Sequence, residues 1–186
     1  MSTEKQAATQ ERVATALSGI SGLDDDAVFL GHDGMVTVTA TGETLLAIVT
    51  ALRDTAGFAT NTLVTARDHG VGMEQRYELY YQFLSYEHGD RVRVRLLTTG
   101  EEPEVPSISE LWPGSRFSER ETFDMFGIRF DGLKDHRRLL MPQGYDHFPL
   151  RKDFPHVGIE PDRLYRQWDE ERRAEFEAEE AARKEG

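Results

Sequence analysis

The amino-acid sequence predicts an α+β domain of two layers with a mainly antiparallel sheet, followed by an extended C-terminal strap and a charged tail. Three observations lead to this class. Apolar residues recur at helical spacing in two early segments, and several others alternate apolar with polar residues as strands do. Turns of hairpin length join these strands and favour antiparallel pairing. Four of the seven prolines then fall between residues 142 and 161, where they exclude a helix.

Residues 1–100 make up the predicted α+β domain, with elements in the order α-β-β-α-β-β-β. The first helix places Val13 and Leu17 on one side, and an Asp-Gly turn at Asp33 joins the two short strands after it. A second helix begins after Thr41, which we expect to cap it. The three later strands are predicted at residues 58–67, 76–86 and 91–96.

Residues 101–139 form a connector and a motif helix that complete the domain. The pattern Ser-x-x-Glu at Ser107 predicts a capping box before one short turn, and the same pattern at Ser118 predicts a box before a longer helix. In that helix we expect Arg120 to pair with Asp124, four residues further along.

Residues 140–161 form the predicted strap, and residues 162–186 form the charged tail. A proline-rich segment of this kind cannot satisfy its own backbone groups, so it must lie on a surface of its own domain or of a partner. Its aromatic residues Tyr145, Phe148 and Phe154 suit a protein interface. The tail is predicted to be a solvated helix or a frayed end.

Composition excludes several functions. The net charge of −12 argues against binding to nucleic acid or to anionic lipid. The absence of cysteine excludes disulfides, thiolate zinc sites and cysteine-ligated iron–sulfur clusters within the chain. The longest apolar stretch, residues 45–52, is too short to cross a bilayer, and no secretion signal precedes the domain. No phosphate-binding loop, nucleophile elbow or histidine pair at metal-ligand spacing occurs.

Charge is unevenly distributed along the chain. Residues 111–155 carry a net charge of +1, between acidic segments of −9 and −4. Two basic pairs stand out there: Arg137-Arg138 and Arg151-Lys152. An anion site is one interpretation, but the neighbouring Asp135 and Asp153 favour an ion-paired anchor between the strap and another subunit. We therefore expect the partner of Arg151 to lie on another chain.

Two long motifs carry a family resemblance. SERETFDMFGI at residues 118–128, followed by PLRKDFP at residues 149–155, resembles the 30 kDa subunit of the proton-pumping NADH–quinone oxidoreductases (respiratory complex I). VPSISELWP at residues 105–113 is also similar to that family. The resemblance is sharp over residues 103–155 and architectural over residues 10–100.

The resemblance implies a non-catalytic scaffold in the peripheral arm of the complex, at the cytoplasmic side of the cell membrane. No cofactor is expected on this chain, whereas NADH, FMN, iron–sulfur clusters and quinone are expected in partner subunits. The partners would be the cluster-carrying and quinone-cavity subunits, without nucleic acid and without direct membrane insertion. The expected interface residues are Glu119, Arg120, Glu121, Asp124, Arg137, Arg138, Arg151, Lys152 and Asp153.

The sequence also departs from the family pattern. Residues 132–137 are GLKDHR where the family has Gly-His-Pro-Asp-Leu-Arg, and His147-Phe148 replaces Gly-His. The departures leave open the equivalent component of a membrane-bound hydrogenase or of a coenzyme F420-linked dehydrogenase. From a different class, a free-standing module could bind an anion through Arg137, Arg138 and Arg151.

Overall fold

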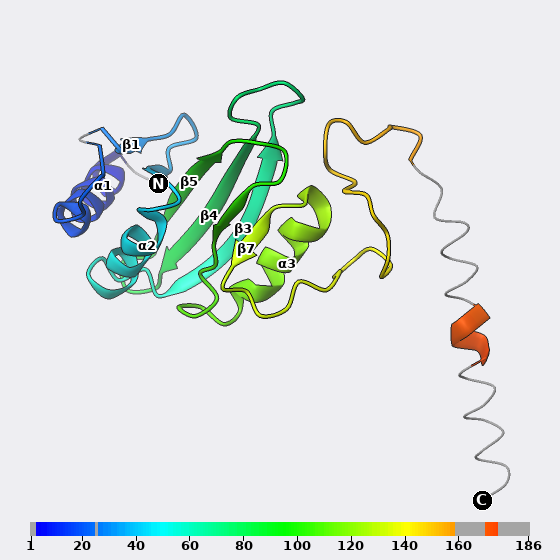
Figure 1. Cartoon of the computed structure of the whole chain (residues 1–186). Helices are drawn as coiled ribbons and strands as arrows, with labels where there is room; N and C mark the ends of the chain where they lie inside the picture. The colour runs from blue at the N-terminus through cyan, green and yellow to red at the C-terminus, as the bar shows by residue number, and fades with distance from the viewer. Residues whose placement is uncertain (1–2, 25, 159–169, 175–186) are drawn as a thin grey trace, which may run out of the picture.

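The computed structural model describes residues 3–24, 26–158 and 170–174 of the chain. Its main sheet has five strands in the order β1-β2-β5-β4-β3, and the helices pack on one face of it (Figure 1). The strands are β1 (Val28–Leu30), β2 (Val36–Ala40), β3 (Thr60–Asp68), β4 (Tyr77–Ser85) and β5 (Asp90–Thr98). The helices are α1 (Thr3–Leu17), α2 (Leu45–Asp54) and α3 (Ser115–Phe126). The predicted α+β class and element order are confirmed.

Sheet pairing is antiparallel between β1 and β2, β3 and β4, and β4 and β5. The central pair is different, because β2 and β5 run parallel, with Val38 opposite Val94. A parallel pair needs a long crossover, and here α2, β3 and β4 all lie between the two strands in sequence. The sheet is therefore mainly antiparallel, as predicted, with one parallel junction.

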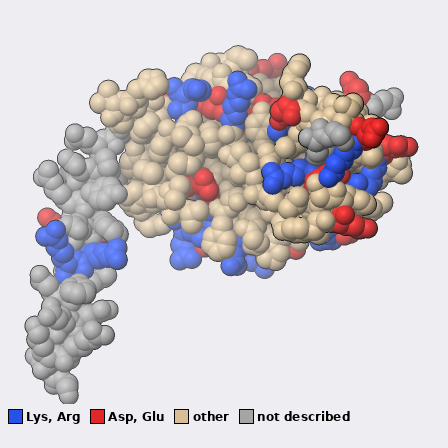
Figure 2. Space-filling model, turned by 180° about the vertical axis from the view of Figure 1, so that it is seen from behind, with Lys and Arg blue, Asp and Glu red and all other residues tan. Residues whose placement is uncertain are grey.

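The core lies between the sheet and the helices. Alternate residues of β4 point into it, and Tyr77, Leu79, Tyr81 and Phe83 are all fully buried. α1 and α2 contribute apolar side chains at helical spacing to the same core. Seen from behind, much of the molecular surface is uncharged, with acidic and basic side chains grouped mainly toward its margins (Figure 2).

The predicted start of the motif helix is wrong. α3 begins at Ser115, after Gly114, and the hydroxyl of Ser115 donates to the carbonyl of Trp112 at 2.6 Å. Ser118 therefore lies inside the helix and caps nothing. The predicted connector also contains a strand, because β6 (Glu104–Pro106) pairs in parallel with β7 (Arg129–Asp131). This two-stranded unit brackets α3 in sequence, so the chain enters and leaves the helix through one small sheet.

The described part of the strap, residues 140–158, contains neither helix nor strand. Isolated turns occur along it, such as that closed by the hydrogen bond from the Phe154 N–H to the Arg151 carbonyl. Residues 170–174 are helical, and the predictions for residues 159–169 and 175–186 lie outside the described residues.

Candidate functional site

The side chain of Asp124, near the end of α3, holds the beginning of the strap. Its Oδ2 accepts hydrogen bonds from the N–H groups of Leu139, Leu140 and Met141, at 3.0, 2.6 and 2.9 Å. Its Oδ1 accepts one from Arg138 at 2.9 Å. Burial opposes ionisation of this fully buried carboxyl, but the four donors prevail and lower its pKa below the ordinary value. We call Asp124 with residues 138–141 the proximal clamp.

Arg138 extends the proximal clamp to the middle of the strap. Its guanidinium also donates to the carbonyls of Asp124 and Tyr145 and lies over the ring of Phe148, 4.7 Å from the ring centroid. Tyr145 itself is only 3% exposed. One arginine therefore joins the helix, the turn at residue 145 and an aromatic ring of the strap.

Arg120 does not pair with Asp124, so that prediction is wrong. It donates instead to the carbonyls of Arg137 and Arg138, at 3.1 and 3.3 Å, and its nearest carboxylate is Asp135 at 3.7 Å. The carboxylate of Asp124 is occupied by strap N–H groups, which gives the helix a tertiary contact in place of a local i, i+4 pair.

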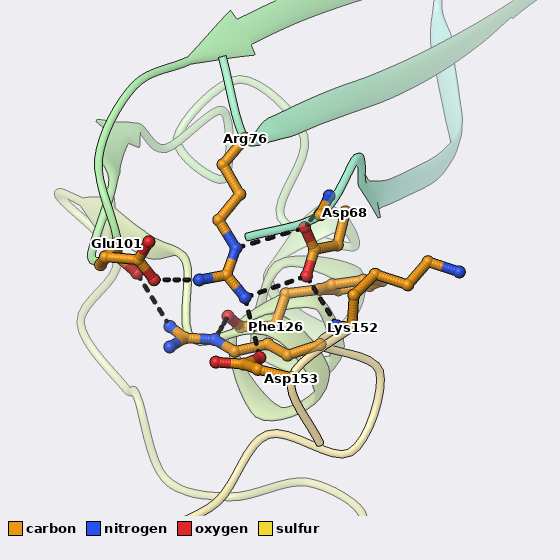
Figure 3. Close-up of polar contacts among 8 residues, drawn as sticks. Asp68, Arg76, Glu101, Phe126, Lys152 and Asp153 are labelled. Carbon is orange, nitrogen blue, oxygen red and sulfur yellow. Dashed lines mark hydrogen bonds and ion pairs between the residues drawn. The ribbon is translucent and has the colours of Figure 1, made fainter. Parts of the chain in front are cut away.

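A second buried carboxylate, Asp68 at the end of β3, holds the far part of the strap (Figure 3). Its Oδ2 accepts the N–H of Lys152 at 2.7 Å. Arg76, which is 1% exposed, pairs with Asp68 and reaches Asp153 at 2.8 Å as well as the carboxylate of Glu101. Burial again opposes ionisation, and Arg76 with the backbone donors lowers the pKa of Asp68. We call this group the distal clamp.

Arg151 lies between the two clamps and has its partners on its own chain. Its Nε donates to the carbonyl of Phe126 at 2.6 Å, and Nη2 donates to the carbonyl of Glu101 at 3.1 Å. Its guanidinium carbon is 4.4 Å from the centroid of the Phe148 ring, which Arg138 also contacts. These contacts correct the expectation that the partner of Arg151 lies on another chain.

Gly127 makes room for this arrangement at the end of α3. It has φ of +77°, the left-handed conformation that closes many helices and that side chains disfavour. A Cβ at this position would lie 2.7 Å from Phe148 and would also collide with Arg151. Only glycine therefore allows the strap to approach the helix end so closely.

Glu119 is buried on the same helix but has no cationic partner. Its Oε1 accepts the N–H of Ile108 at 2.8 Å, and its Oε2 accepts the hydroxyl of Ser107 at 2.6 Å. Burial raises the pKa of this carboxyl above its ordinary value, and these two hydrogen bonds only moderate the rise. The contact also corrects the capping box predicted at Ser107, because the Ser107 hydroxyl bonds the side chain of Glu119 in α3.

The predicted interface residues divide into two sets. Glu119 and Asp124 are buried, and Arg120, Arg138 and Arg151 are partly buried against their own domain; the exposed members are Glu121, Arg137, Lys152 and Asp153. Arg137 forms a two-point pair with Asp135, at 2.9 Å for both bonds. Each of the three arginines proposed for an anion module thus has its own partner, and they do not form a common site.

Asp68, Arg76 and Glu101 were missed by the sequence analysis. Asp68 and Arg76 flank a loop, and Arg76 pairs with residues 8, 25 and 77 positions away, so no local pattern marks them. Within the described segments, no group of three histidine or acidic residues could hold a metal ion, and no helix is long and apolar enough to cross a membrane. The hydrogen bonds of the buried carboxylates fix the strap in place.

A family model described as "Respiratory-chain NADH dehydrogenase, 30 Kd subunit" matches residues 38–160, more than half of the chain. The chain belongs to this family. Both clamps lie within the matched range. The resemblance seen in the two motifs is therefore confirmed.

Similar members of the 30 kDa family include the equivalent subunits of the NADH-quinone oxidoreductases of Azorhizobium caulinodans and Rhizobium etli. Each is 42% identical over 128 residues, which are 68% of this chain. The match spans 60% and 63% of those proteins, so the chain covers about three fifths of their length.

Two solved structures are similar in fold. A trypsin-resistant fragment of Nqo5 is 25% identical with a TM-score of 0.56, covering 68% of this chain and 98% of the fragment. A chain of the membrane-bound sulfane sulfur reductase, an archaeal respiratory membrane complex, has a TM-score of 0.67 over 80% of this chain and 86% of its own. At 18% identity, the second likeness concerns the fold alone.

Proposed function

We propose that this chain is a non-catalytic scaffold subunit in the peripheral arm of a membrane-attached NADH–quinone oxidoreductase, at the cytoplasmic side of the membrane. The complex would couple electron transfer from NADH to quinone with proton translocation. The chain would dock onto the subunits that carry the terminal iron–sulfur cluster and shape the quinone cavity. NADH, FMN, the clusters and quinone would all be bound by partner subunits. Family membership and the names of the relatives support this proposal.

The orientation of the strap is the observation that carries the docking role. Its backbone and basic side chains are turned inward to the two clamps, whereas Leu140, Leu150 and Val157 are 62%, 53% and 99% exposed. Apolar side chains presented in this way favour burial against another protein. Because the clamps already order the strap, a partner would not have to supply the free energy for ordering it.

The predicted interface residues then have two different roles in the proposal. Asp124, Arg138 and Arg151 hold the strap in the shape that the partner meets. The exposed Glu121, Arg137, Lys152 and Asp153 would lie at the polar rim of the interface, where individual charges contribute little affinity. The apolar side chains of the strap would provide most of the contact free energy.

Affinity purification tests this proposal. The full chain, tagged in its native host, should be recovered from gently solubilised membranes together with cluster-carrying and membrane-embedded subunits. Leu140→Asp combined with Leu150→Asp should lower that recovery at least tenfold. Tyr86→Asp is the matched control, since Tyr86 is 74% exposed just beyond the end of β4 remote from the clamps.

The electron-input subunits in the same sample distinguish related complexes. NADH-oxidising subunits support the proposal, whereas hydrogenase or coenzyme F420-dependent subunits would assign the chain to a relative of that complex. Recovery of the wild-type chain as a lone protein would contradict the scaffold role.

A further inference from the structure

A groove of about 810 Å³ lies between the first turns of α3 and the loop of residues 132–137. Leu133 lines it and is 7% exposed, and Phe117 on α3 is 48% exposed beside it. Arg116 and Lys134 stand on its two sides, one on the helix and one on the loop. An apolar lining flanked by cations is therefore open to solvent on this side of the domain.

The groove is positively charged although the chain is acidic. Four basic residues and two carboxylates line it. Arg137 engages both oxygens of Asp135, and Arg120 is turned toward backbone carbonyls. Arg116 lies over the ring of Phe117, 4.7 Å from its centroid. Neither Arg116 nor Lys134 has a carboxylate partner among the described residues, so two cations remain available.

A second hollow of the molecule has the opposite character. It measures about 610 Å³, and its charged lining residues are Glu43, Glu104 and Asp131. The excess of basic groups beside α3 is thus a local property of that groove and is not shared by this second depression in the described surface.

We propose that the groove beside α3 binds an acidic segment of a partner subunit. Carboxylates of that segment would pair with Arg116 and Lys134, and one of its apolar side chains would pack on Phe117. Exposed arginine beside an exposed aromatic ring is the composition that protein interfaces favour. The two cations stand on opposite sides of an open groove, so they suit a peptide segment better than one small anion, which needs converging donors.

The proposal rests on the scaffold function and extends it to a second surface. The loop that lines the groove leads directly into Arg138 of the proximal clamp. A partner that covers the strap would therefore meet the groove at the edge of the same contact. Clamp and groove differ in chemistry, because the strap presents apolar groups and the groove presents cations without a carboxylate partner.

Charge reversal tests the proposal in the native complex. Arg116→Glu combined with Lys134→Glu should lower the recovery of partner subunits with the tagged full chain about tenfold. The matched control is Arg91→Glu combined with Arg129→Glu, which makes the same charge change at two exposed positions away from the groove lining. An unchanged thermal midpoint of the purified variant chain would show that the domain still folds.

The outcomes are separable from failure of the scaffold function. If the wild-type chain recovers no partner, the scaffold proposal is wrong. If the wild type recovers partners and the groove variant does so equally well, or no worse than the control, the groove proposal is overturned.

A photo-reactive benzoylphenylalanine in place of Phe117 identifies the occupant in intact membranes. A cross-link to a partner segment containing Asp or Glu supports the proposal. A cross-link to the tail of this same chain, to a segment without acidic residues, or to nothing would overturn it.

Discussion

Two carboxylates on α3, Glu119 and Asp124, are equally buried and behave in opposite ways. Both side chains belong to residues with no exposed surface, five positions apart on one helix. Burial raises the pKa of Glu119, whereas the pKa of Asp124 is lowered although burial acts on it in the same direction. Burial alone therefore does not decide whether a carboxyl in this domain ionises readily.

The donors around each carboxyl explain the difference. Asp124 receives three backbone N–H groups and one guanidinium, whereas Glu119 receives one N–H and one hydroxyl. Only a charged acceptor benefits fully from so many donors. The proximal clamp is thus built for an anion, whereas the contact around Glu119 also suits a neutral group.

Removing the carboxylate of the proximal clamp should have the largest effect. Asp124→Ala leaves Arg138, whose side chain is 10% exposed, without its carboxylate and leaves three strap N–H groups unpaired. We expect the free energy of unfolding to fall by about 3–5 kcal/mol, measured by urea denaturation with tryptophan fluorescence. Asp146→Ala, at an exposed strap position, is the control and should change it by less than about 0.5 kcal/mol. A loss below about 1 kcal/mol for Asp124→Ala would mean that the strap is not held by this group.

Acidification should weaken the same clamp. The folded pKa of Asp124 is lowered, so its contribution to stability is present above the unfolded pKa, about 3.9, and is lost as pH falls through the folded value. Each unit of lowering corresponds to about 1.4 kcal/mol. Melting temperatures of the wild type and Asp124→Asn, compared from pH 7 to pH 3, should converge on acidification. A constant difference would contradict the assignment.

Glu119 should show the reverse dependence and a smaller effect. Its folded pKa is raised, so its contribution is fully present below the unfolded pKa, about 4.3, and declines as pH rises through the folded value. Glu119→Gln cannot ionise and keeps an oxygen to accept a hydrogen bond. Its stability at pH 7 should equal or exceed that of the wild type by up to about 1 kcal/mol, with the difference shrinking toward pH 4. Thermal denaturation across this range would reveal an opposite trend.

The smallest effect is expected at Asp153 in the distal clamp. Its ion pair with Arg76 measures 2.8 Å, about the same as the 2.9 Å pair of Asp124 and Arg138, but its side chain is 46% exposed. Water and salt screen such a pair, so Asp153→Asn should lower the unfolding free energy by no more than about 1 kcal/mol. A loss comparable to that of Asp124→Ala would show that ion-pair geometry outweighs burial.

The sequence was sufficient to predict most of the domain. Alternation along β4 and β5 identified the buried face of the sheet, because a strand with one solvated face repeats every two residues. Turn residues placed the β1–β2 and β4–β5 hairpins. These features are local, and local patterns predict them well. The parallel pairing of β2 with β5 is not local and was not predicted.

The clamps could be predicted only in part. The motif around Asp124 was singled out, but its partner was placed one helical turn away at Arg120, when the donors lie 14 to 17 residues further along. Asp68 and Lys152 are separated by 84 positions. Contacts of this kind depend on where the strap crosses the finished domain, and no periodicity in the chain records that path.

The parallel junction of β2 and β5 has a consequence for synthesis of the protein. Val36 pairs with Val92, so the first hairpin is complete long before its neighbour in the sheet has left the ribosome. At about 5–20 residues per second, the delay is on the order of 3–11 s. During that time α2 has no sheet to cover, and its apolar side chains are available to chaperones. We therefore expect the nascent chain to be most aggregation-prone between the emergence of α2 and that of β5.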